Sequence, residues 1–317
     1  MKKRLMTSGV ILLILVVAFL SRMLTPYVFD LVVLTMAVLG VVEIARVLER
    51  SKKYSNILVV GTFPAVLYLI AIFVIIKKLN WQYLVTGIFF AILFYFLLVF
   101  LLTLCTKQTT KKEMEKYELT ETSVAKYAFD KAIYSLTVFV YPGLLFLTLI
   151  LLNHFSELVF ISSVRAELTT LTTFILLFVF TVTICTDSLA MVVGSTLKGP
   201  KLCPLISPNK TVSGAIGGLV GGAGSGMMLY GFFTLSSQFN SELSIVGGAW
   251  WQILIIALLG SVVSQGGDIL ASALKRKARV KDYGTIFPGH GGVMDRVDGL
   301  VFNSLFCFIA FTMMIVL

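Results

Sequence analysis

The stretch from Ser272 to Asp298 gathers residue types that can bind and activate phosphate groups. Its 27 residues include six Lys and Arg, three Asp, one of the two histidines of the chain and a Pro-Gly-x-Gly-Gly turn. Lys and Arg pair with phosphate oxygens, carboxylates hold divalent cations, and glycines let backbone N–H groups approach an anion. Because long apolar segments flank this stretch, its charges are costly unless they have a function. We therefore predict a membrane-embedded enzyme with a polar active loop.

Two acidic residues fall inside apolar segments that precede this loop. Asp187 and Asp268 each lie where an ionised carboxylate costs about 2.5–3.5 kcal/mol at the centre of a span and less toward its end. Asp268 and Ser272 are four residues apart and share a helix face, which continues to Lys275 and Arg276. This spacing predicts a line of acid, hydroxyl and cations that leads to the loop. The alternative is an acid at the membrane interface that reaches water.

Two further acids, Asp295 and Asp298, lie three residues apart where the last apolar segment begins. At a helix N-terminus they could cap N–H groups and stabilise the helix dipole. Alternatively, they could bind a divalent cation that is shared with substrate phosphates. His290 lies between glycines and could bond a phosphate or transfer a proton. The basic run 275–281, taken alone, is typical of clusters that bind anionic lipid headgroups.

A second polar loop, Lys198–Val212, precedes a glycine-rich segment. Ser207, Lys210 and Thr211 lie where that segment begins, so they could bind a phosphate or simply cap a helix. The segment itself repeats glycine every four residues, at 214, 218, 222 and 226, which predicts close helix packing in a bilayer. No phosphate-binding motif of the P-loop or dinucleotide-fold type is present in the sequence, so a nucleotide would be held by another scheme.

The composition indicates which elements position these residues. Of the 317 residues 58% are hydrophobic and 13% are charged, and the mean hydropathy is +0.96. Such values, with apolar runs near the length of a spanning helix, predict an all-α polytopic integral membrane protein with about nine transmembrane helices. The predicted spans are approximately Leu5–Leu20, Tyr27–Leu48, Ile57–Ile76, Tyr83–Cys105, Tyr127–Leu152, Leu168–Val193, Ser213–Thr234, Ile245–Ser272 and Gly299–Leu317. The Tyr141-Pro142-Gly143 triplet predicts a kink in the fifth.

The net charge of +10 reflects membrane topology rather than a nucleic-acid partner. With a cytoplasmic N-terminus, 21 of the 26 Lys and Arg fall on the inner side, as the positive-inside rule expects. Both polar loops then face the cytoplasm. The four cysteines form no C-x-x-C pair, which argues against a zinc site or a disulfide framework. We divide the chain into residues 1–126, with four helices and a cytoplasmic loop, and a catalytic region of five helices at 127–317.

The polar positions of the C-terminal stretch match a known pattern. Ser272-x-Leu274-Lys275-Arg276, then Lys281-Asp282-x-Gly284, then Phe287-Pro288-x-His290-Gly291-Gly292-x-x-Asp295-Arg296-x-Asp298 resembles the signature of the phosphatidate cytidylyltransferases, or CDP-diacylglycerol synthases. Gly267-Asp268, Asp187-Ser188-x-Ala190 and Ser207-Pro208-x-Lys210-Thr211 also look like features of this family, so the resemblance runs from about Thr186 to the C-terminus. The chain departs from the pattern at Met191, Ser195 and Ser213.

The resemblance implies that CTP and phosphatidic acid react to give CDP-diacylglycerol and pyrophosphate, in phospholipid biosynthesis at a bacterial cytoplasmic membrane. It implies a need for Mg²⁺ or another divalent cation, with a second cation left open. The implied catalytic residues are Asp268, Asp295, Lys281 and His290. The implied metal ligands are Asp268 and Asp295, with Asp187, Asp282 and Asp298 as further candidates. The implied phosphate-binding residues are Ser207, Lys210, Thr211, Ser272, Lys275, Arg276, Gly291, Gly292 and Arg296.

Three alternatives remain at this point. A CTP-dependent polyprenol or phytol kinase would transfer the γ-phosphoryl group to a lipid alcohol, and a cytidylyltransferase could act on an ether isoprenoid lipid instead. A transporter would also bury acids along a substrate path, although the polar residues here gather on one membrane face. The glycine repeat would serve packing within the chain or a homodimer equally well.

Overall fold

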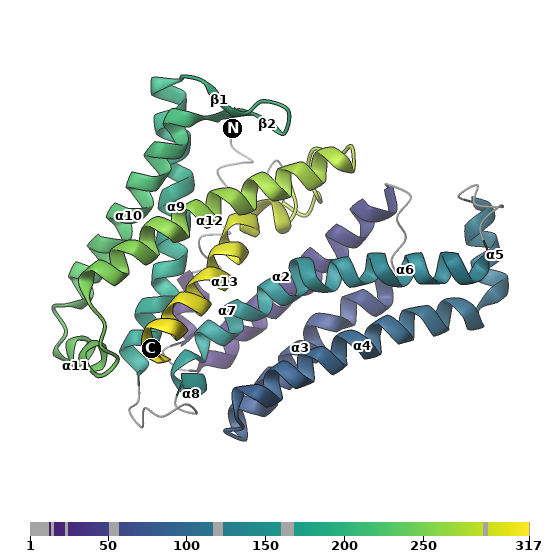
Figure 1. Ribbon diagram of the computed structural model, residues 1–317, viewed down its shortest axis with the longest axis horizontal. Coiled ribbons are helices and arrows are strands. Elements are labelled where there is room, and N and C mark those ends of the chain that lie inside the picture. Colours follow the sequence, from purple (N-terminus) through teal and green to yellow (C-terminus); the bar gives the residue numbers. More distant parts are fainter. Residues whose placement is uncertain are drawn as a thin grey trace.

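The chain folds as an all-helical polytopic membrane protein, as its composition predicts. The computed structural model describes residues 13, 16–22, 25–50, 57–116, 123–159, 168–287 and 291–316. In this part of the chain, eight segments are long and apolar enough to cross a membrane. The first predicted span, about residues 5–20, lies mostly outside the described residues. The structure is drawn in Figure 1.

In the described residues the chain consists of helices and one small hairpin. The helical elements are α2 (Pro26–Arg50), α3 (Ile57–Ile76), α4 (Trp81–Cys105), α5 (Lys107–Lys116), α6 (Val124–Val138), η1 (Phe139–Leu144), α7 (Leu145–Asn153), α8 (Phe155–Val159), α9 (Thr169–Leu197), α10 (Val212–Phe233), α11 (Ser237–Ile245), α12 (Trp250–Lys277) and α13 (Met294–Val316). The antiparallel strands β1 (Lys201–Cys203) and β2 (Ser207–Thr211) form the hairpin between α9 and α10.

Two predicted boundaries near the polar loop were wrong, and both errors have a local cause. The eighth span was expected to begin near Ile245, but α11 ends there and Gly247, with a φ of +65°, turns the chain before α12. Helix α12 then continues to Lys277, so the first cations of the basic run are helical. The last span begins at Met294 rather than Gly299, because its first five residues are polar enough, with Asp295 and Asp298, to resemble a loop in composition.

Helix α10 packs closely against α9 and α12 through its glycine repeat. A Cβ added at Gly218 would lie 2.9 Å from the carbonyl oxygen of Thr186, and one at Gly226 would lie 2.9 Å from the Cβ of Ala257. Only glycine therefore lets these three backbones approach so closely. The predicted packing role of the repeat is confirmed, and these glycines face helices of the same chain. As a result, the ends of α9, α10, α12 and α13 meet near the hairpin (Figure 1).

The N-terminal helices join this group through α2, which contacts η1, α7 and α13. Helices α3 and α6 contact α2, and α4 packs against α3 and α6 (Figure 1). Among these helices the ring of Phe63 lies 4.4 Å from that of Phe139 and 5.2 Å from that of Tyr95, between centroids. The predicted kink at Tyr141-Pro142-Gly143 is confirmed, because Tyr141 leaves helical geometry with φ −125° and ψ 112° inside η1.

A buried ionic network fixes the junction between α7 and α8 to α2. The Nε2 atom of His154 lies 2.8 Å from the Asp30 carboxylate, and its Nδ1 atom lies 2.8 Å from the Glu157 carboxylate. The amide of Asn153 donates a further hydrogen bond to Asp30 at 2.8 Å. Burial alone would lower the pKa of His154, but the hydrogen bonds and charges of these two carboxylates raise it to about 9. The imidazole is therefore a cation at neutral pH.

This network predicts a specific dependence of stability on pH. Because the pKa of His154 is higher in the folded chain than its ordinary 6.5, protonation stabilises the fold fully below pH 6.5, and this contribution disappears as pH rises through 9. At about 1.4 kcal/mol per pKa unit, about 3 kcal/mol depends on this proton. We expect the melting temperature of the detergent-solubilised protein to fall between pH 6.5 and 9.5, and to fall less in His154→Gln. Equal slopes in the two proteins would contradict the assignment.

Candidate active site

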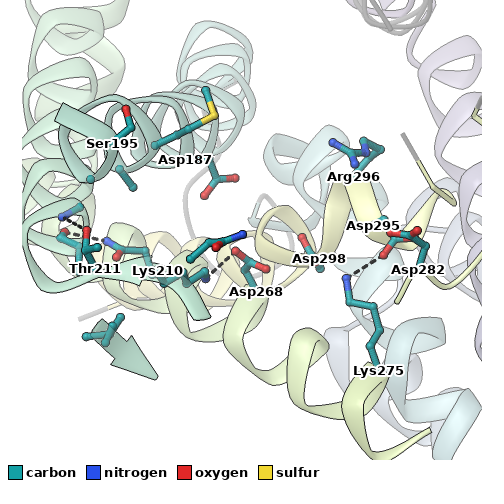
Figure 2. Close-up of a pocket in the computed structure, with 18 residues that line it drawn as sticks. Asp187, Ser195, Lys210, Thr211, Asp268, Lys275, Asp282, Asp295, Arg296 and Asp298 are labelled. Carbon is teal, nitrogen blue, oxygen red and sulfur yellow. Dashed lines mark hydrogen bonds and ion pairs between the residues drawn. The ribbon is translucent and has the colours of Figure 1, made fainter. Parts of the chain in front are cut away.

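A polar cavity of about 550 Å³ lies where the ends of α9, α10, α12 and α13 meet the hairpin. Figure 2 shows the side chains that line it. Its charged lining residues are Asp187, Lys210, Asp268, Lys275, Asp282, Asp295, Arg296 and Asp298. Segments separated by more than a hundred residues in sequence thus contribute to one cavity.

The first ion pair of the cavity joins the hairpin to α12. The Nζ atom of Lys210 lies 2.5 Å from the carboxylate of Asp268, and both side chains are about one-quarter to one-third exposed, at 25% and 32%. Lys210 is held there because the next residue, Thr211, accepts the N–H of Gly214 at 3.1 Å and so caps α10. A partly exposed pair of this kind contributes little stability, so an incoming ligand can separate it at low cost.

The second ion pair joins α12 to the first turn of α13 and is much less exposed. Lys275 Nζ lies 2.7 Å from Oδ1 of Asp295, whose side chain is only 3% exposed. Oδ2 of Asp295 accepts the backbone N–H groups of Tyr283 at 2.8 Å and Gly292 at 2.9 Å. Gly291 has a φ of +83°, which only glycine adopts without strain and which directs the chain back toward Asp295. Asp295 therefore joins Tyr283 and Gly292 of the loop to each other and to Lys275 of α12.

Tyr283 attaches the same loop to α12. Burial raises the pKa of Tyr283 above its ordinary value, and the carboxylates of Asp298 and Asp295 raise it further. The phenol thus stays protonated, and it donates a hydrogen bond to the carbonyl oxygen of Ala271 at 2.8 Å. Lys275 also lies 5.1 Å from the centroid of the Tyr283 ring, a cation–π contact. Tyr283 is consequently fixed against the helix that carries Asp268.

Carboxylates outnumber cations around the cavity. The described lining residues include five Asp but only three Lys or Arg. Asp187, Asp268 and Asp298 are near enough to repel one another electrostatically. No group of three metal-ligating side chains is preformed among the described residues. Magnesium, however, is commonly bound by one or two carboxylates together with substrate phosphates and water. The donor set therefore fits a divalent cation that enters with a phosphate ligand.

The structure brings most of the predicted site residues together. Those that line the cavity are Asp187, Lys210, Thr211, Asp268, Lys275, Asp282, Asp295, Arg296 and Asp298. Those outside its lining are Ser207, Ser272, Arg276, Lys281, Gly291 and Gly292. Arg276 instead donates a hydrogen bond from Nε to the carbonyl oxygen of Ile206 at 3.2 Å, which tethers the hairpin. His290 lies outside the described residues, so its predicted role stays a prediction.

Several uncharged lining residues were not predicted from the sequence. They include Ser195, Leu202, Asn209 and Gln265. Gln265 lies three residues before Asp268, on the same helix face, and this spacing was the available signal. Figure 2 shows Ser195 and Thr211 at one end of the cavity and Asp282, Asp295 and Arg296 at the other. The cavity therefore has a weakly charged end and a strongly charged end.

A smaller cavity of about 110 Å³ adjoins the polar one and is mainly apolar. Its walls come from α2, α7, α9 and α13, and they include Val33, Leu149 and Ile184. Asp187 and Arg296 line both cavities. One ligand can therefore place a charged group at Asp187 and Arg296 and an apolar group in the smaller cavity between the spanning helices.

Comparisons with known proteins identify the family of this chain. Residues 2–314 match the sequence model of the cytidylyltransferase family. A phosphatidate cytidylyltransferase of Brucella abortus biovar 1 (strain 9-941) is 45% identical over 126 residues, which are 40% of this chain and 42% of that protein. The phosphatidate cytidylyltransferase of Bacillus subtilis (strain 168) is 43% identical over 123 residues, which are 42% of its length. That of Staphylococcus saprophyticus subsp. saprophyticus is 39% identical over 127 residues, which are 45% of its length.

Each of these alignments spans less than half of the relative's length. The family model, in contrast, extends over nearly the whole chain. Its span includes the apolar N-terminal helices as well as every described residue of the polar cavity. This protein therefore belongs to the cytidylyltransferase family.

Proposed function

We propose that this protein is a phosphatidate cytidylyltransferase, which converts CTP and phosphatidic acid to CDP-diacylglycerol and pyrophosphate. The observation that carries the proposal is the shared wall of the two cavities at Asp187 and Arg296. A nucleoside triphosphate that carries a divalent cation fits the chemistry of the polar cavity, and a lipid phosphate can meet it there with the first part of its tails in the apolar cavity. The names of the similar bacterial proteins support the same activity.

The reaction mainly requires two polyanions to be aligned. An oxygen of the lipid phosphate attacks the α-phosphorus of CTP, the bond from that phosphorus to the bridging oxygen of the β-phosphate breaks, and pyrophosphate leaves. Positioning and charge neutralisation provide most of the acceleration in phosphoryl transfer. Arg296 lies where the lipid phosphate would enter, and Lys210 and Lys275 line the remainder of the polar cavity. These cations would hold the reacting phosphates in line.

The acids would hold a divalent cation, which when bound neutralises phosphate charge. We assign Asp268 and Asp295 as its main ligands, with Asp187 and Asp298 beside them, since all four line the cavity. Lys210 and Lys275 now neutralise the two main acids. Each lysine could turn from its carboxylate to a phosphate when the cation and nucleotide arrive. The nucleoside would then lie at the weakly charged end, near Ser195 and Asn209.

The proposed location follows from the charge distribution. Eight apolar helices in the described residues make this an integral membrane protein, and we propose the bacterial cytoplasmic membrane because the matched relatives are bacterial. The excess of Lys and Arg near the polar loops favours an active site that faces the cytoplasm, where CTP is made.

The products of the reaction distinguish the proposal from a lipid kinase. With labelled CTP, Mg²⁺ and phosphatidate, we expect the purified protein to release pyrophosphate and to form a CDP-lipid. A polyprenol should not replace phosphatidate. Release of CDP together with a phosphorylated polyprenol would show γ-phosphoryl transfer and would reject a cytidylyltransferase. Transport of a solute without any turnover of CTP would reject both enzymes.

Removal of one carboxylate charge tests the assignment of the acids. Asp268→Asn and Asp295→Asn keep side-chain volume, and we expect each to reduce kcat/KM at least about 100-fold, because the charge that holds the cation is lost. The matched control is Asp130→Asn, which removes an equal charge from an acid outside both cavities. Full pyrophosphate release by either site variant, with normal insertion into the membrane, would disprove its assignment.

The apolar cavity predicts a selective effect on the lipid substrate. Ile184 lines that cavity and is 51% exposed, so Ile184→Trp should fill the cavity without overpacking the core. We expect KM for long-chain phosphatidate to rise about tenfold, while KM for a short-chain analogue and for CTP changes little. Val192→Trp is the control, because Val192 is on the same helix, is 49% exposed and lines neither cavity. An equal effect of both variants would contradict the placement of the tails.

A further inference from the structure

Glu43 is a buried acid in the C-terminal third of α2 that connects the N-terminal helices to the active-site loop. Only 2% of the surface of Glu43 is exposed. Its Oε1 accepts the backbone N–H of Val293 at 3.0 Å, and its Oε2 accepts the N–H of Met294 at 3.0 Å. The carboxylate thus caps the start of α13 from a helix that lies 250 residues earlier in the chain. A negative charge at a helix N-terminus also stabilises the helix dipole.

The loop folds closely around this carboxylate. A Cβ added at Gly284 would lie 2.8 Å from Cδ of Glu43, and one at Gly292 would lie 2.5 Å from the same atom. A side chain at either position would therefore displace Glu43 or the loop. These two glycines belong to the motif that resembles the family signature. The space that Glu43 occupies explains why both positions require glycine in this structure.

Three consecutive amide groups of the loop are shared between Glu43 and Asp295. The N–H of Gly292 points to Asp295, whereas the N–H groups of Val293 and Met294 point to Glu43. The two carboxylates therefore hold the same turn through consecutive amides. Because Asp295 and Arg296 follow directly, the position of this turn determines where both side chains enter the polar cavity.

We propose that Glu43 is a positioning residue for the active site, which acts by fixing the loop that presents Asp295 and Arg296. Glu43 lines neither cavity, so it acts through the loop rather than on a substrate. The structural claim concerns the loop alone. Its expected consequence for catalysis rests on the function proposed above.

Glu242 provides a matched control for a purely structural cap. It is also buried, at 4% exposure, and its carboxylate accepts the N–H groups of Leu171 at 2.6 Å and Thr170 at 3.3 Å. It thereby caps α9 from α11, as Glu43 caps α13 from α2. Neither Glu242 nor the amides that it accepts line either cavity. The two acids thus perform the same local task at different distances from the active site.

The primary test measures the loop directly and does not depend on activity. In Glu43→Gln one carboxylate oxygen becomes an amide NH₂ that faces a backbone N–H, so the cap is broken. We expect hydrogen–deuterium exchange in the full-length protein to accelerate across residues 283–296. In Glu242→Gln it should accelerate near residues 169–172 instead. Unchanged exchange across 283–296 in Glu43→Gln would overturn the proposal.

The second test separates positioning from general destabilisation. We expect Glu43→Gln to raise the Mg²⁺ concentration needed for half-maximal turnover, and for half-maximal thermal stabilisation with CTP, about 10- to 100-fold, as for outer partners of metal ligands. Glu242→Gln should lower the melting temperature without this shift. If both variants lose only stability, Glu43 is a structural cap and not a positioning residue.

A third variant guards against failure to fold. Glu43→Asp keeps the charge on a shorter side chain, and we expect loop exchange and Mg²⁺ requirement between those of the wild type and Glu43→Gln. An aspartate variant with wild-type exchange but altered Mg²⁺ requirement would contradict action through the loop. If the wild type lacks turnover of CTP with phosphatidate, the proposed function fails, whereas the exchange measurements still decide the role of Glu43.

Discussion

The energetic cost of charge inside an apolar helical bundle is the constraint on which this structure depends. A buried ion is tolerated only when partners from other segments satisfy it. Asp30 of α2 pairs with His154 at the junction of α7 and α8, Glu242 caps α9, and Glu43 caps α13. Each of these contacts joins elements that are distant in sequence. Charge satisfaction therefore specifies how the helices assemble, while the apolar surface contributes bulk packing without comparable directionality.

Close backbone packing converts this assembly into a site. Because glycines let α10 approach α9 and α12, Asp187 on α9 and Asp268 on α12 come near enough to interact. The hairpin that begins α10 then places Lys210 beside Asp268. Larger residues at the glycine positions would separate these helices and enlarge the distance between the acids. The proximity of Asp187 and Asp268 thus depends on the glycine repeat of α10.

Local patterns predicted the elements and most charged residues of the site, but not the contacts between segments. Asp268, Lys275 and Asp295 could be identified because charged residues at helical spacing are conspicuous among apolar ones. The role of Glu43 could not be identified, since one acid in a span gives no indication of which distant amides it binds. The end of α12 at Lys277 was also not predicted. Three consecutive cations have the composition of a loop, but cations also stabilise the C-terminus of a helix through its dipole.

The charge balance of the polar cavity relates the ion pairs seen in the structure to the proposed binding of a nucleotide with a cation. Five carboxylates and three cations leave the described lining negative when all are ionised, and a triphosphate would be repelled by such a surface. Two of the carboxylates are nevertheless paired with lysines, Asp268 in a partly exposed contact and Asp295 in a nearly buried one. A divalent cation that displaced the lysines would release them toward phosphates and, by adding two positive charges, would cancel the net negative charge of the described lining. The same five acids that disfavour a bare nucleotide would then favour its cation complex.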